Sequence, residues 1–292
     1  MPTRARRSER AEELARDHPE AAPLLDFYRD LLEIQEPLSE HRSLRSWGDR
    51  VSVPPGADGS TALRLDRLPV DDLLDDFRRF LEDLVPAATP VLKPVGRRLA
   101  TGPSDAASRT LEAFLAGRRL EGPAGELGCT PFQLAFFPRA FLQPVAEGLA
   151  SLAPARAGAG SGHGNGDPDG DPRTECPVCG HPPVVGLIAD EQEVENRRRL
   201  VCSLCATAWP FPRLTCPACG ETEPDLLGHY VAEEWPHLRL EECESCGRYL
   251  KTADLREDGH AVPVVDDLAS PELDVWADDQ ELRKIHRNVL GI

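Results

Sequence analysis

Aromatic residues are scarce in this 292-residue sequence, at 5% of the total, and no apolar run approaches the ~20 residues that a membrane-spanning helix needs. The N-terminus, MPTRARRSERAEELARDHPE, is basic but lacks the apolar core of a secretory signal. Forty per cent hydrophobic content is ordinary for a globular protein. These features predict a cytoplasmic protein without membrane insertion.

Basic residues are also in short supply, with 33 Lys and Arg against 50 Asp and Glu and a net charge of −17. A surface this acidic repels polyanions. The charge therefore argues against DNA or RNA as a partner.

The first half of the chain, residues 1–153, has helical patterns of hydrophobic residues. The clearest is Val70 to Leu84, where apolar residues recur on one helical face after Pro69 and before Pro86. Three further helices are expected at 24–34, closed by Pro37, at 108–119 and at 131–152. Residues 154–173 consist mainly of Ala, Gly, Asp and Pro, a composition typical of a flexible linker.

Eight of the nine cysteines form CxxC pairs: Cys176/Cys179, Cys202/Cys205, Cys216/Cys219 and Cys243/Cys246. In a reducing compartment such pairs indicate metal binding rather than disulfides. Cys129 lies outside the pattern and is expected to be buried like a small apolar residue.

An internal repeat relates residues 174–209 to 214–249. Each copy has a CPxCG opening, a strand-like run (Val184 to Ala189, Leu226 to Ala232), an Arg-Leu pair, a second CxxC pair and an aromatic residue. The pairs are separated by 22 residues in the first copy and 23 in the second. Because each repeated unit can close its own site, the repeat favours sequential grouping, with Cys176, Cys179, Cys202 and Cys205 in one site and Cys216, Cys219, Cys243 and Cys246 in the other. The alternative grouping joins Cys202/Cys205 with Cys216/Cys219 in one site and leaves the two outer pairs to form the other.

Four thiolates complete a tetrahedral shell around a metal ion, with no position left for water or substrate. Each CxxC pair is expected to form a tight turn, called a knuckle below. Three of the knuckles are followed by a glycine, Gly180, Gly220 or Gly247, which is suited to a left-handed backbone conformation. We therefore expect two structural or electron-transfer metal ions and no catalytic residue. The four-sulfur shell suits zinc and iron equally. His181 and His229 are expected to remain outside the complete shells.

The cysteine-bearing region is itself acidic, with 8 Lys and Arg against 16 Asp and Glu from Thr174 to His260. It lacks the basic surface that phosphate binding requires. The run Arg197 to Arg199 is interpreted as a solvated hairpin edge. Asp266 and Asp267 could perform acid–base chemistry, but no pocket or histidine accompanies them in the sequence, and helix capping or solvated charge is the favoured interpretation.

Together these patterns predict a helical domain (1–153), a flexible linker (154–173), two tandem rubredoxin-like or zinc-ribbon modules (174–212 and 213–263) and a C-terminal tail with a short helix (264–292). The fold class is therefore α plus small β.

Several of these strings resemble the family of the formate dehydrogenase accessory protein FdhE. They are the CPxCG opening, RRLVCSLCATAW from Arg198 to Trp209, CGRYLKT from Cys246 to Thr252, VVDDLAS, and AFLQPVAEGLA in the helical half. The resemblance is dense over about 176–276. It implies a cytoplasmic, non-catalytic maturation factor that binds the catalytic subunit of formate dehydrogenase before export, and it places all eight paired cysteines at the family's metal-ligand positions.

A maturation factor for formate dehydrogenase is therefore the leading hypothesis, and it depends on the resemblance. A rubredoxin-like electron-transfer protein is the alternative that the cysteines by themselves leave open.

Overall fold

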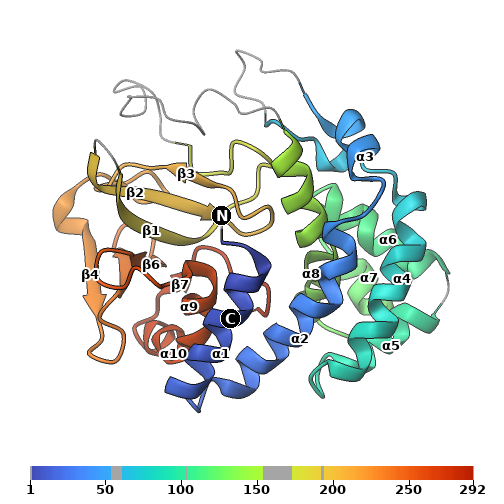
Figure 1. Ribbon diagram of the computed structural model, residues 1–292, viewed down its shortest axis with the longest axis horizontal. Coiled ribbons are helices and arrows are strands. Elements are labelled where there is room, and N and C mark those ends of the chain that lie inside the picture. Colours follow the sequence, from blue (N-terminus) through green and yellow to red (C-terminus); the bar gives the residue numbers. More distant parts are fainter. Residues whose placement is uncertain (1, 54–60, 103, 154–172, 192–193, 292) are drawn as a thin grey trace. The chain divides into compact units, whose positions relative to one another are not determined.

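The computed structural model describes residues 2–53, 61–102, 104–153, 173–191 and 194–291. The chain forms two compact units, one of residues 1–26 with 155–290 and the other of residues 27–154. Figure 1 shows helices from the first half of the chain and strands from the second. Of the predicted linker 154–173, residues 154–172 lie outside the described residues.

The helical unit contains most of helix α2 and the helices α3 to α8. Their bounds are α2 Ala22–Ser39, α3 Leu44–Val51, α4 Val70–Ala87, α5 Lys93–Thr101, α6 Ser104–Leu115, α7 Glu121–Glu126 and α8 Pro131–Leu152. All four helices expected from the sequence are present, and the helical fold class of this half is confirmed. Within the described residues, no helix is both long and apolar enough to span a bilayer.

Prolines end the helices less sharply than the sequence indicated. Pro37 and Pro86 lie inside α2 and α4, which continue to Ser39 and Ala87. A proline lacks the N–H that would bond to the carbonyl four residues earlier, but its fixed φ is compatible with a helix, so the helix can continue for one or two residues beyond it. Each of these helices therefore ends one or two residues after its proline, and not before it as the sequence indicated.

Helix α8 forms the centre of the helical core. Thr130 caps it through a reciprocal pair of hydrogen bonds with Gln133. Phe137 and Phe141 are fully buried, and the Phe141 ring packs 5.0 Å from that of Phe77 on α4. The helix is continuous through Pro138 and Pro144, so the apolar composition of 131–152 reflects burial on nearly all sides.

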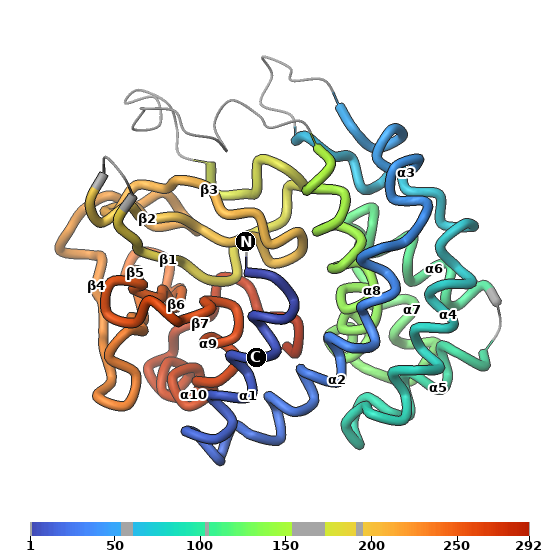
Figure 2. Tube along the Cα trace, in the orientation of Figure 1, coloured from blue at the N-terminus to red at the C-terminus, as the bar shows by residue number. Residues whose placement is uncertain are grey.

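The second unit is built on one mixed seven-stranded sheet. Its strands are β1 Pro183–Glu191, β2 Val194–Cys202, β3 Ala208–Pro210, β4 Leu227–Val231, β5 Leu238–Cys243, β6 Arg248–Asp254 and β7 Arg283–Lys284. The path runs β3-β2-β1-β6-β5-β4, and β7 pairs with β6. Each repeat thus forms an antiparallel meander, which can be followed in Figure 2.

The two repeats share this sheet because β1 and β6 pair in parallel, with Gly186 opposite Thr252. Gly186 permits the contact, since a Cβ atom at this position would lie 2.3 Å from the Thr252 hydroxyl oxygen. The modules expected as separate ribbons are therefore two halves of one sheet.

One face of the sheet is covered by helices from both ends of the chain. Helix α9 (Pro263–Ala269) contacts β1 and β6, and helix α1 (Arg4–Asp17) packs on α9. Helix α10 (Pro271–Asp279) adds Leu273 and Ala277 to a cluster with Leu240 and Tyr249 of the sheet. The tail expected to contain one short helix contains two, and α1 belongs to the compact unit that holds the cysteines.

Candidate metal centres

The structure gathers the eight paired cysteines into two groups of four. One group contains Cys176, Cys179, Cys202 and Cys205, and the other contains Cys216, Cys219, Cys243 and Cys246. Each group could hold a metal ion. The grouping is the sequential one indicated by the repeat.

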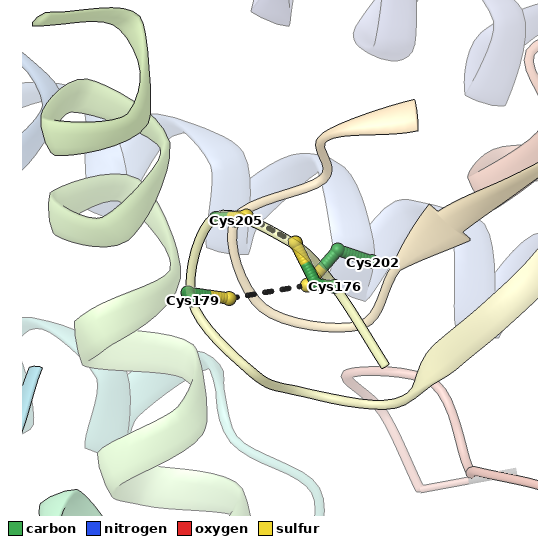
Figure 3. A group of neighbouring side chains, drawn as sticks. All are labelled: Cys176, Cys179, Cys202 and Cys205. Atoms are coloured by element: carbon green, nitrogen blue, oxygen red, sulfur yellow. Dashed lines mark hydrogen bonds between the residues drawn. The ribbon is translucent and has the colours of Figure 1, made fainter. Parts of the chain in front are cut away.

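The strands explain this convergence. In each repeat the first knuckle precedes a strand, the next strand ends on the third cysteine (Cys202 or Cys243), and the fourth cysteine lies in the turn that follows. The hairpin therefore brings the second CxxC pair of each repeat next to the first pair. Figure 3 shows the two loops of the first group facing each other with their sulfur atoms between them.

The sulfur separations fit a four-thiolate shell. In the first group the Sγ atoms of Cys176 and Cys205 lie 3.6 Å apart and those of Cys179 and Cys202 lie 3.4 Å apart. The corresponding distances in the second group are 3.8 and 3.7 Å. Ligands about 2.3 Å from a central ion at tetrahedral angles lie about 3.8 Å from one another. A disulfide would require about 2.05 Å.

The knuckle backbones are shaped to point sulfur atoms and N–H groups inward. Gly180, Gly220 and Gly247 have φ values of 78°, 78° and 63°, as expected from the sequence. Ala206 takes the same position in the remaining knuckle with φ 53°, an unusual conformation for a residue with a Cβ atom. Backbone N–H groups of Val178, Leu204 and Ala218 donate to cysteine sulfurs at 3.4 Å; such bonds stabilise thiolate charge.

The two groups differ in their exposure to solvent. All four cysteines of the first group are buried, whereas Cys219 of the second is exposed and Cys246 is half-buried. Burial raises the pKa of the Cys202 thiol and of the Cys216 thiol because it disfavours the charged form. Burial by itself therefore favours protonated thiols, and a shell of four thiolates requires a cation among the sulfur atoms.

The remaining cysteine and histidines lie outside these groups. Cys129 is half-buried, and its sulfur lies 3.7 Å from the carbonyl oxygen of Ala124. The expectation of full burial was wrong, because Cys129 lies in the exposed turn before α8. His181 lies beside the carbonyl of Cys179 and His229 is exposed.

Asp266 is buried in an ion-pair cluster, so its interpretation as a solvated charge was wrong, whereas its bond to the backbone of Val262, the N-cap residue of α9, agrees with the capping interpretation. Its carboxylate accepts hydrogen bonds from Arg10 at 2.6 Å and from the backbone N–H of Val262 at 2.7 Å. His237 Nε2 lies 2.8 Å from it. Arg10 also pairs with Asp258 at 2.7 Å. The Arg10 guanidinium thus supplies positive charge beside the carboxylates of Asp258 and Asp266, and the cluster attaches α1 to α9.

Asp267 is buried as well, beside two lysines. Its Oδ1 atom lies 2.7 Å from Lys284 Nζ and 3.1 Å from Lys251 Nζ, and Asn288 donates to Oδ2 at 2.8 Å. Lys251 also pairs with Asp274 at 2.7 Å. Burial opposes ionisation of Asp267, but the charges of Lys251 and Lys284 outweigh it and hold its pKa below the usual range. The sequence does not show these pairs, because the partners are distant in the chain.

Comparison with known proteins relates the whole chain to one family. A protein from Aquifex aeolicus named as an FdhE homologue is 30% identical over 275 residues, which cover 94% of this chain and 90% of the relative. The chain belongs to the FdhE family. Models of the FdhE central and C-terminal domains match residues 175–213 and 214–290, the two repeats and the tail.

Other FdhE proteins match either a part or the whole of the chain. The homologue from Pseudomonas aeruginosa is 41% identical over 119 residues, or 38% of each chain. The crystal structure of the FdhE protein from Pseudomonas aeruginosa matches 99% of this chain and 96% of its own, with a TM-score of 0.67 and 26% identity. The FdhE fold therefore extends over both units of this chain.

Proposed function

We propose that this FdhE protein is a maturation factor for formate dehydrogenase that binds the enzyme's catalytic subunit in the cytoplasm. The observation that supports the proposal most strongly is similarity to an FdhE homologue over 94% of the chain. The eight cysteines would hold two metal ions, zinc or iron, in closed shells that stabilise the sheet. A closed shell suits a binding protein better than a hydrolytic enzyme, because it offers no open coordination position.

Co-purification tests the proposed partnership. The full-length tagged protein is expected to retain the molybdenum- or tungsten-containing subunit of formate dehydrogenase from cytoplasmic extract, and deletion of its gene should abolish formate oxidation. Wild-type formate oxidation in the deletion strain would refute the role. The matched control is the deletion strain complemented with the Cys129→Ala variant, which changes a cysteine outside both groups and should restore activity.

A rubredoxin-like electron carrier is the second candidate, and the exposure of Cys219 favours it, since a thiolate at the surface would bring a redox-active ion close to a partner. An absorption spectrum of the protein as purified tests the electron-carrier candidate. Thiolate-to-iron bands in the visible region would support the electron carrier, whereas a colourless protein with two zinc ions would exclude it.

The difference in exposure predicts unequal metal release. With an excess of chelator, we expect the second group to lose its ion roughly tenfold faster than the first, equivalent to about 1.4 kcal/mol in the free energy of local opening. A colorimetric chelator should record two phases of equal amplitude. The Cys243→Ala/Cys246→Ala variant should lack the fast phase, and loss of the slow phase instead would reverse the assignment.

A further inference from the structure

A hollow of about 410 Å³ opens on the sheet face opposite α9 and α10. It spans both repeats, with Ile188 and Arg198 from the first and most of the remaining lining from the second. All of its lining belongs to the cysteine-bearing unit. Its volume lies within the range of pockets that bind small organic molecules, roughly 300–1,000 Å³.

The strand register explains which side chains face this hollow. Alternate residues of a strand point to opposite faces. Leu240 of β5 packs against α10, so Arg239 and Glu241 point to the other face. Leu250 lies opposite Glu241 on β6 and shares that face. The same alternation brings Arg248 to the rim beside Cys243.

The hollow concentrates the positive charge of an acidic region. Residues 174–260 contain only eight basic residues, and four of them line the hollow: Arg198, Arg213, Arg239 and Arg248. The carboxylates in the lining are Glu241 and Glu242. The arginines in the lining therefore outnumber the carboxylates by four to two, although the region as a whole is strongly negative.

Two of these arginines form ion pairs with other residues of the fold, and the other two are exposed and could contact a ligand. Arg198 is 4% exposed and donates to Glu241 at 2.5 Å, which corrects its interpretation as part of a solvated edge. Arg239 pairs with Asp254. Arg213 and Arg248 are exposed, and they form no ion pair within the described parts of the chain.

Most of the other residues that line the hollow are apolar, the exceptions being Thr215, His229 and the metal-site cysteines Cys216 and Cys243. Ile188 and Leu250 are buried beneath it, and Leu214 lies at its edge with 60% of its side chain exposed. Exposed leucine beside unpaired arginine forms a surface with both apolar and cationic parts. We propose that this hollow binds an organic anion with a carboxylate or phosphate attached to an apolar body, Arg213 and Arg248 contacting the anionic group. The inference does not depend on a role in formate dehydrogenase maturation.

The arginines could instead serve only to balance thiolate charge, because Cys216 and Cys243 also line the hollow. The two explanations differ in their consequences. If the arginines only balance charge, their removal weakens metal retention and leaves anion binding unchanged. If they bind a ligand, their removal weakens anion binding while both metal ions remain.

The test uses 8-anilinonaphthalene-1-sulfonate, a fluorescent probe with a sulfonate on an apolar body, and the full metal-loaded chain. In the Arg213→Gln/Arg248→Gln variant the dissociation constant should rise about tenfold. Arg283→Gln removes one positive charge, half the change in the double variant, from an exposed residue of β7 that does not line the hollow, and should change the constant less than about twofold. Equal affinity in wild type and the double variant would overturn the proposal.

Competition on the wild-type protein gives a second, independent measurement. Displacement of the probe by 3-phenylpropionate, but not by the neutral 3-phenylpropanamide, would support a carboxylate ligand. Stronger displacement by phenyl phosphate would indicate a phosphorylated one. Failure of both anions to displace the probe would contradict the proposed site, even if the double variant did not fold.

Discussion

Replacing Cys202 and Cys205 together with alanine is expected to leave one bound metal ion per chain in place of two. These residues supply two of the four sulfurs of the first group, and two thiolates cannot complete a closed shell. Metal binding supplies the folding energy of such sites, on the order of 10 kcal/mol for structural zinc. The hairpin of β1 and β2 should therefore lose its hydrogen-exchange protection.

Metal analysis of the purified full-length variant, with amide hydrogen exchange, measures both effects. Cys129→Ala is the matched control and should retain two ions. Retention of two ions by the Cys202→Ala/Cys205→Ala variant would show that the sequential grouping does not hold the metal. Because β1 also pairs with β6, partial loss of protection in β6 would show how strongly the repeats depend on each other.

Replacing Lys251 with methionine should produce the second large effect, a loss of about 3–5 kcal/mol in the free energy of unfolding. The lysine is fully buried and pairs with Asp267 and Asp274. Methionine fills similar space but leaves these carboxylates with less compensating charge, and Lys284 then has to balance both. Urea denaturation followed by tryptophan fluorescence measures the change.

The same substitution at Lys93, which is half-buried in the helical unit, provides the control and should change stability by less than about 0.5 kcal/mol. A Lys251→Met variant within 1 kcal/mol of wild type, taken as roughly the effect of an average substitution, would show that the buried pairs contribute little.

The stability lost in the Lys251 variant should depend on pH in a defined direction. Burial opposes the charge on Lys251, but Asp267 and Asp274 outweigh it and raise its pKa. The lysine therefore stays charged through the acidic and neutral range. The pKa of Asp267 is lowered, so its contribution is complete above the ordinary carboxyl pKa of 3.8 and is lost as the pH falls below that value. The difference between wild type and variant should therefore stay constant at higher pH and shrink as the pH falls below 3.8.

The cysteine grouping could be predicted from the sequence because it depends on local repetition. Each CxxC turn brings two sulfurs together, and one hairpin joins two such turns, so the geometry is contained within about thirty residues. The helices of the first half were predictable for a similar reason. A periodic apolar face such as that of Val70–Ala87 is a local property of the chain.

The shared sheet and the buried charges could not be predicted in this way, because they depend on distant residues. Strands β1 and β6 are separated by more than 50 residues, and parallel pairing leaves no turn motif between them. Asp266 depends on Arg10, 256 residues away. A pair of aspartates at the start of a helix favours capping on local grounds, and the bond from Val262 to Asp266 agrees with it. The charged partners that bury both carboxylates come from α1, β6 and β7.

The burial of Lys251 and Lys284 has a practical consequence for chemical labelling. The chain contains only three lysines, and the third is Lys93. Two of the three side-chain amines are withheld from solvent within ion pairs. Among the lysine side chains, an amine-reactive dye or crosslinker should therefore modify that of Lys93 selectively, which leaves the cysteine-bearing unit unmodified at its lysines for studies of metal and ligand binding.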